Sequence, residues 1–145
     1  KELIKNGYIK TVKEGFDTIL SENRGIYVPS QKVSSFDVIK IIKSAGGVSI
    51  LAHPLISLEK EELPAFLTEA KTYGLDAIET MYSKYNEGDR EFSDSIAEEF
   101  GLLKSGGSDF HGENKPEISL GSGCGDLAVP YDFAKKLEAS ENIEY

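Results

Sequence analysis

Gly46-Gly-Val-Ser-Ile-Leu-Ala-His-Pro54 joins the end of a predicted helix to a short apolar run and a histidine. The two glycines are typical of a helix end, because glycine adopts the left-handed C-cap conformation without a side-chain clash. Residues 48–52 are apolar, partly β-branched and short enough for a buried strand. Proline cannot continue a strand ladder, so we expect the strand to end at Pro54 with His53 at its carboxyl end.

Amphipathic helices alternate with apolar strands on both sides of this segment. Upstream, Ser34 and Ser35 offer helix caps, and Val38, Ile41, Ile42 and Ala45 follow at helical spacing as a predicted buried face. Downstream, a helix from about Pro64 to Gly74 precedes a strand at 76–81. A helix from about Asp89 to Gly101 precedes a strand at 102–105, and a last helix starts near Pro130. The pattern predicts an α/β protein of parallel βα units, with residues 1–145 forming a single domain.

The amino-terminal part offers scaffold and no chemistry. Thr11-Val-Lys-Glu14 has the form of a capping box, and Val12, Phe16, Ile19 and Leu20 then give a helix one apolar face. Residues 26–28, before Pro29, resemble a short extended piece.

A second segment, Lys104-Ser-Gly-Gly-Ser-Asp-Phe-His-Gly112, follows the third strand. In extended backbone, residues two apart project to the same face, so Asp109 and His111 can converge on one point. A borderline divalent metal accepts both oxygen and nitrogen ligands. The pair alone is more typical of a capped turn with a surface histidine than of a metal site.

The carboxyl ends of parallel strands share one rim, where ligands bind in such sheets. His53 closes one strand, Tyr82-Ser83 the next, and Asp109 with His111 the third. The predicted topology therefore brings both histidines of the chain to one edge beside an aspartate. Further imidazole ligands of a multi-metal site cannot come from this chain, which has 2 histidines.

Several other side chains near this rim could serve either the functional site or the fold. Glu79 is either a further carboxylate of the site or a buried ion-pair partner. Ser108 either binds a phosphate or belongs to a turn. Tyr82 and Tyr85 either contact a substrate or pack in loops, and Cys124 is read as structural.

Composition narrows the classes of function. The 145 residues carry 16 basic and 25 acidic side chains, a net charge of −9, which disfavours binding of duplex DNA. The single cysteine excludes an internal disulfide framework and fits a reducing, cytoplasmic compartment. No apolar run reaches membrane-spanning length, so we expect no membrane association.

At these motifs the sequence resembles the carboxyl-terminal part of the polymerase-and-histidinol-phosphatase (PHP) superfamily of metal-dependent phosphoesterases. The nearest group contains bacterial nucleoside 3′,5′-bisphosphate phosphatases and RNA 5′-end trimming enzymes. The resemblance runs through most of the chain. It is carried by Gly7-Tyr-Ile, Phe16-Asp-Thr-Ile-Leu20, Tyr27-Val-Pro29, Ala45 to Pro54, Gly74-Leu-Asp-Ala-Ile-Glu79, Tyr82-Ser-Lys84, Gly101 to Gly112 and Leu120-Gly121.

The resemblance implies the C-terminal portion of an incomplete barrel of about seven βα units. It implies that His53, Asp109 and His111 are metal ligands, in a site that holds up to three divalent ions (Mn, Zn, Fe or Mg) in the full enzyme. Ser83, Lys84 and Ser108 are the candidate substrate-binding residues. The family's amino-terminal His-x-His motif, its following aspartate and its middle Glu and His ligands are absent from the chain and are expected upstream of Lys1. Tyr85 stands where the family tends to have histidine.

Two functions follow as hypotheses. In the first, the full-length protein hydrolyses a small phosphorylated nucleotide or a short RNA 5′ end with metal-activated water, and the isolated chain is inactive. In the second, the chain is a catalytically silent fragment or binding module with an incomplete metal site. The sequence defines neither the metal, the exact substrate nor the oligomeric state.

Overall fold

The computed structural model describes residues 1–21 and 33–140. Contacts divide the chain into two compact units, Lys1–Val33 and Ser34–Tyr145, and each is described here by itself. The single domain over residues 1–145 stays a prediction. The expected extended piece at 26–28 and the Tyr27-Val-Pro29 match lie outside the described residues.

The first unit contains two short helices, α1 (Glu2–Lys5) and α2 (Val12–Asp17). The Thr11 hydroxyl accepts the backbone N–H of Glu14 at 3.0 Å, as a capping box requires. The Glu14 carboxylate, however, accepts the backbone N–H of Lys10 at 2.7 Å, so only the threonine half of the predicted box forms. Val12 and Phe16 stay 58% and 63% exposed, so the predicted apolar face is not buried within this unit.

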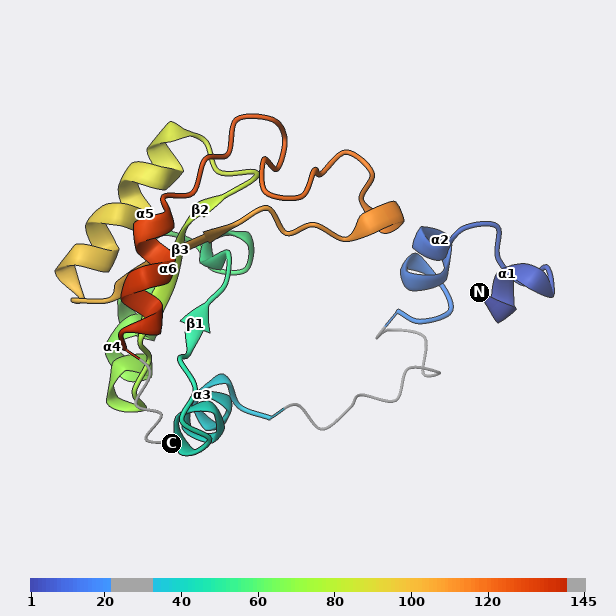
Figure 1. Ribbon diagram of the computed structural model, residues 1–145. Helices are drawn as coiled ribbons and strands as arrows, with labels where there is room; N and C mark the ends of the chain where they lie inside the picture. The colour runs from blue at the N-terminus through green and yellow to red at the C-terminus, as the bar shows by residue number, and fades with distance from the viewer. Residues whose placement is uncertain (22–32, 141–145) are drawn as a thin grey trace. The chain divides into compact units, whose positions relative to one another are not determined.

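The second unit is built on a parallel sheet of β1 (Ile50–Leu51), β2 (Ala77–Tyr82) and β3 (Leu103–Gly107), in the order β1-β2-β3 (Figure 1). Before, between and after the strands come α3 (Ser35–Ser44), α4 (Leu63–Thr72), α5 (Glu87–Glu99) and α6 (Tyr131–Glu138). Two 3-10 turns, η2 (Pro54–Ile56) and η3 (Gly112–Asn114), follow β1 and β3. The predicted α/β class with parallel βα units is confirmed.

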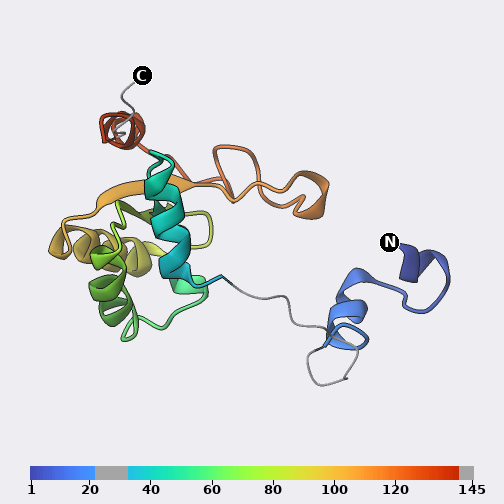
Figure 2. The same cartoon turned by 90° about the horizontal axis from the view of Figure 1, so that it is seen from below.

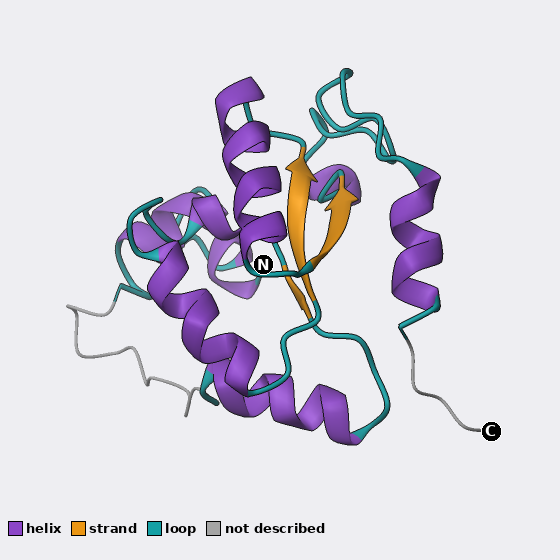
Figure 3. Cartoon of the chain, turned by 90° about the vertical axis from the view of Figure 1, so that its left-hand side faces the viewer, coloured by secondary structure: helices purple, strands orange, loops and turns teal. Residues whose placement is uncertain are grey.

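Helices cover the two faces of this sheet unequally. In Figures 2 and 3, α4 and α5 lie on one side and α6 on the other. The hydrophobic core lies on the first side, where Ile78 of β2 meets side chains from α3, α4 and α5. Its fully buried members are Leu63, Leu67, Ala70, Ile78 and Ala97. In the described parts of both units, no helix is long and apolar enough to cross a bilayer.

Helix α3 presents a different face to the core from the one predicted. Val38 and Ile41 are 41% and 60% exposed, whereas Ile39 is 6% exposed. The reason is aromatic packing, because the Phe36 ring stacks on Phe66 and on Tyr73 with centroid distances of 5.4 and 5.0 Å. This turns the Phe36–Ile39 side of the helix inward, and the predicted Val38–Ile41 face is wrong.

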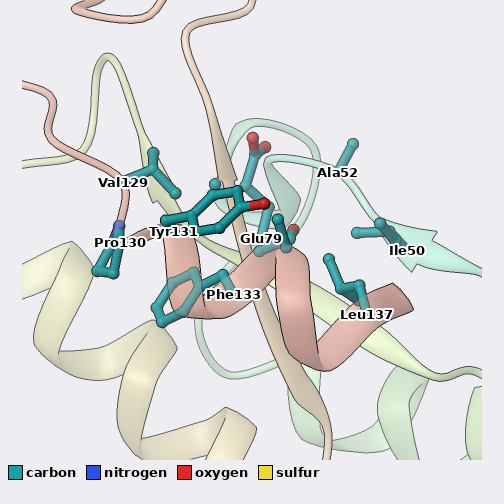
Figure 4. A pocket seen from close by; sticks show the side chains of 11 residues that line it. Ile50, Ala52, Glu79, Val129, Pro130, Tyr131, Phe133 and Leu137 are labelled. Carbon is teal, nitrogen blue, oxygen red and sulfur yellow. The ribbon is translucent and has the colours of Figure 1, made fainter. Parts of the chain in front are cut away.

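A cavity of about 510 Å³ lies between the other sheet face and α6 (Figure 4). Its walls are mainly apolar, and the only carboxylate that lines it is Glu79 of β2. The other lining residues are Ile50, Ala52, Ser105, Gly106, Val129, Pro130, Tyr131, Phe133, Ala134 and Leu137. Glu79 therefore lies between this cavity and the strand ends.

The pairing of β2 with β3 has an irregularity that brings the two backbones close together. Glu79 pairs with Ser105, but Met81 pairs with Gly106, so Thr80 is an extra residue on β2. A Cβ added to Gly106 would lie 2.8 Å from the Cβ of Met81, 2.8 Å from a methyl of Val129 and 2.9 Å from the Met81 carbonyl. Only glycine fits this position.

We therefore predict that Gly106→Ala lowers the free energy of unfolding by about 2 kcal/mol, because the backbone of β2 must move to admit the methyl group. Urea unfolding followed by circular dichroism measures the loss. The matched control is Gly88→Ala in α5, where the nearest atom to the added Cβ is 3.4 Å away and where alanine is the better helix former. Equal stability of G106A and G88A would contradict the packing described for the β2–β3 pair.

Candidate metal centre

Two of the three predicted metal ligands, His53 and Asp109, lie on either side of Tyr82 at the carboxyl ends of the strands. His53 follows β1, Tyr82 ends β2, and Asp109 follows β3. The rings of His53 and Tyr82 have a centroid distance of 5.3 Å. The Tyr82 hydroxyl donates a hydrogen bond of 3.2 Å to Oδ2 of Asp109. The topology thus brings together residues that are 56 positions apart in the chain.

Both of these residues have strained backbones. His53 has φ 30° and Asp109 has φ 56°, and they are the non-glycine residues with positive φ in the described ranges. Such a conformation is uncommon for residues with a side chain and costs about 1–3 kcal/mol, so it persists only where surrounding contacts impose it. Strain at two predicted ligands is typical of a functional site.

Glu79 is the contact that holds His53. Its Oε2 accepts the backbone N–H of His53 at 2.6 Å, and the His53 carbonyl accepts the N–H of Ile56 at 3.0 Å in the following turn. Gly107 leaves room for the carboxylate, since a Cβ there would lie 3.2 Å from Oε1 of Glu79. Burial raises the pKa of Glu79, although the His53 N–H opposes the rise. The structure gives Glu79 a further role, as the acceptor of a backbone N–H beside the site, while its reading as a carboxylate of the site stays a prediction.

The Asp109 carboxylate accepts two hydrogen bonds on one oxygen. Besides Tyr82, the ammonium of Lys115 lies 2.6 Å from Oδ2. The Lys115 hydrogen bond is the main cause that lowers the pKa of Asp109, burial opposes it, and the Tyr82 hydroxyl adds to the lowering. Asp109 is therefore an anion at neutral pH.

His111 turns toward its own loop. The ring is half exposed, and its Nδ1 lies 2.7 Å from the backbone carbonyl of Asp109 and 3.5 Å from Oδ1 of the same residue. Asp109 and His111, which were predicted to converge, are thus in contact with each other within the loop.

The residues fit a divalent metal in kind. Nδ1 of His53 is buried without a hydrogen-bond partner, which leaves a nitrogen donor free, and Asp109 adds an anionic oxygen. Within the described residues, no three His, Cys, Asp or Glu side chains are grouped as a complete metal site. The assignment of His53, Asp109 and His111 as ligands stays a prediction.

Two of the three candidate substrate-binding residues use their hydroxyls inside the fold. Ser83 donates to the carbonyl of Ser108 at 2.6 Å, and Ser108 accepts the N–H of Gly121 at 3.3 Å. Both serines are buried, and Gly123 packs against Ser83 so closely that a Cβ would overlap it. These contacts tie the loop after β3 to the end of β2. Lys84 is exposed and lines a hollow of about 260 Å³.

Tyr85, where the family tends to have histidine, is a packing residue. Its ring meets Tyr82 edge to face at 5.3 Å, and its hydroxyl accepts the N–H of Leu55 at 3.0 Å. Burial raises the pKa of Tyr85 to about 12, so its hydroxyl stays protonated at neutral pH.

Lys115 is the contact of this site that sequence reasoning missed. It follows η3, six positions after Asp109, and no spacing rule assigns a partner across such a turn. The one feature of the sequence that pointed to this contact is the position of Lys115 in the same loop as Asp109 and His111.

Curated relatives and solved structures were compared with this chain. A 5′-3′ exoribonuclease of Haemophilus influenzae is 27% identical over 110 residues, 75% of this chain and 40% of the relative. A 3′,5′-nucleoside bisphosphate phosphatase of Chromobacterium violaceum is 27% identical over 112 residues, 77% of this chain and 39% of the relative. No family model matches the chain.

Among solved structures, a Bifidobacterium adolescentis protein assigned as a metal-dependent phosphoesterase superposes with a TM-score of 0.69 at 29% identity. The match covers 98% of this chain and 49% of that protein. The chain is thus similar to metal-dependent phosphoesterases, as its motifs predicted. The predicted fold class, parallel βα units forming part of a PHP barrel, is confirmed. The chain spans about two fifths of the length of the curated relatives, at 40% and 39%.

The hydrogen bond from the His53 N–H to Glu79 leads to a testable prediction. Glu79→Ala removes the acceptor of the His53 N–H and lowers the free energy of unfolding by about 2 kcal/mol. Glu79→Gln keeps an oxygen acceptor and loses less than half of that. Urea unfolding gives the stabilities, and amide hydrogen exchange at His53, measured by NMR, reports the bond directly.

In E79A the His53 amide exchanges faster than in wild type, and in E79Q the change is smaller. If the exchange rate at His53 is the same in all three proteins, Glu79 does not hold this backbone.

Proposed function

We propose that this chain contributes part of the active site of a phosphoesterase that hydrolyses a small phosphorylated nucleotide or the 5′ end of a short RNA. The observation that carries the proposal is the pair of strained residues, His53 and Asp109, held beside Tyr82 at the ends of successive parallel strands. The relatives support the substrate class, since one is a 5′-3′ exoribonuclease and another a 3′,5′-nucleoside bisphosphate phosphatase.

In this proposal, residues of the chain hold the nitrogen and oxygen atoms that would bind the metal in fixed positions. Glu79 fixes the backbone of His53, and Tyr82 orients the Asp109 carboxylate. His53, Asp109 and His111 would hold divalent ions of the type Mn, Zn, Fe or Mg. The chemistry that a bound ion supplies is activation of water and neutralisation of phosphate charge. Lys84, exposed at the same rim, is available to a substrate phosphate, whereas Ser83 and Ser108 support the loop.

The enzyme proposal is tested on protein that carries this chain together with the upstream segment in which a His-x-His motif and an aspartate are expected. His53→Ala is expected to lower kcat at least about 100-fold, because loss of a ligand costs more than loss of a residue that orients one. Phosphate release from a nucleoside 3′,5′-bisphosphate and nucleotide release from a short 5′-phosphorylated RNA measure it. Leu120→Ala, a change at an exposed loop residue, is the control. Hydrolysis that is unchanged in H53A would contradict the proposal.

The alternative, a catalytically silent fragment, is favoured for the isolated chain by one observation. The described residues contain no complete group of three metal donors. We therefore expect the 145-residue chain alone to bind metal weakly and to hydrolyse a generic phosphoester negligibly. Robust hydrolysis by the isolated chain that is lost in H53A would refute this expectation.

A further inference from the structure

Lys115 forms an ion pair with the carboxylate of Asp109, a predicted metal ligand. Its Nζ lies 2.6 Å from Oδ2 of Asp109, and the two side chains are 34% and 20% exposed. The Tyr82 hydroxyl donates to the same oxygen at 3.2 Å. In the described residues, Lys115 is the cationic side chain that contacts a predicted ligand from outside the ligand set.

Hydrogen bonds hold the backbone around Lys115, whereas its side chain is partly exposed. Its N–H donates to the Gly112 carbonyl at 3.2 Å, and its carbonyl accepts the N–H of Ile118 at 3.1 Å. Ile118 is 2% exposed and anchors the loop. The flexible stem of the lysine and its partial exposure allow the ammonium to leave the carboxylate without a change in the loop.

An ammonium and a divalent cation are alternative partners of one carboxylate. Both are attracted by the same anion, and they repel each other at short distance. Oδ1 of Asp109 lies 3.5 Å from Nδ1 of His111, whereas Oδ2 contacts Lys115 and Tyr82, whose ring lies beside that of His53. A metal ion at Oδ2 would therefore have to displace Lys115, and a metal ion at Oδ1 would lie close to the ammonium and be repelled by it.

We propose that Lys115 is a built-in competitor of the metal ion, which neutralises Asp109 in the metal-free protein and thereby sets the affinity for divalent cations. This rests on the proposed function only in taking Asp109 as a metal ligand. The weak metal binding that we expect of the isolated chain then has two causes, the incomplete donor set and an internal cation that pairs with one donor.

The experiment is a Mn²⁺ titration of the 145-residue chain at low ionic strength, with free Mn²⁺ followed by electron paramagnetic resonance. Lys115→Gln and Lys115→Met both remove the charge, and the methionine keeps the apolar stem. Both are expected to lower the Kd for Mn²⁺ by about tenfold, through loss of a partly exposed ion pair and of cation–cation repulsion. Lys115→Arg keeps the charge and is expected to bind like wild type.

Lys60→Gln is the matched control, because it removes a second Lys–Asp ion pair, to Asp89 at 2.8 Å, and changes the net charge equally. Its Kd stays at the wild-type value if the effect is local. Asp109→Asn and His53→Ala report on the metal centre itself and are expected to weaken binding.

Two results would overturn the inference, and each has a different meaning for the metal centre. If K115Q and K115M bind Mn²⁺ no more tightly than wild type or K60Q, while D109N and H53A weaken binding, Lys115 does not compete although the metal centre stands. If neither D109N nor H53A changes the binding, the isolated chain holds Mn²⁺ elsewhere and Lys115 has no bound metal to compete with, whereas the proposed function is tested separately by the kinetics of H53A in the longer protein.

Discussion

The central strand β2 is the constraint on which the arrangement of the site depends. It pairs in parallel with β1 on one side and β3 on the other, and Ala77, Ile78 and Thr80 are fully buried. Because both neighbours run in the same direction, the chain must leave all three strands at one rim. Tyr82, the last residue of β2, then lies between His53 and Asp109 and contacts both.

The site is held by contacts from the fold more than by contacts among the predicted ligands. Glu79 accepts the His53 N–H, Ser83 bonds the loop that begins at Ser108, and Lys115 neutralises Asp109. These contacts surround the two residues with left-handed backbones and offset their strain. In the proposed function this arrangement supplies part of a metal site, and the chain spans 40% and 39% of the two relatives.

Sequence reasoning predicted the features that local chemistry controls. β1 covers Ile50–Leu51 instead of the predicted 48–52, but it ends before Pro54 and leaves His53 at the rim, and helical spacing located α3 to α6 within a few residues. It did not predict which side of α3 faces the core, because stacking of Phe36 on two distant rings decides that. For the same reason it missed the acceptor role of Glu79 and the Lys115 ion pair, which depend on partners brought together by the fold.

The most direct test of a metal centre at this rim is paramagnetic broadening in the NMR spectrum of the isotope-labelled chain on addition of Mn²⁺, which detects weak binding. The account predicts that broadening centres on the amides of His53, Asp109 and His111 and spares the acidic start of α5, where Glu87 and Asp89 lie. Broadening that centres on those acidic residues, with the rim unaffected, would contradict it.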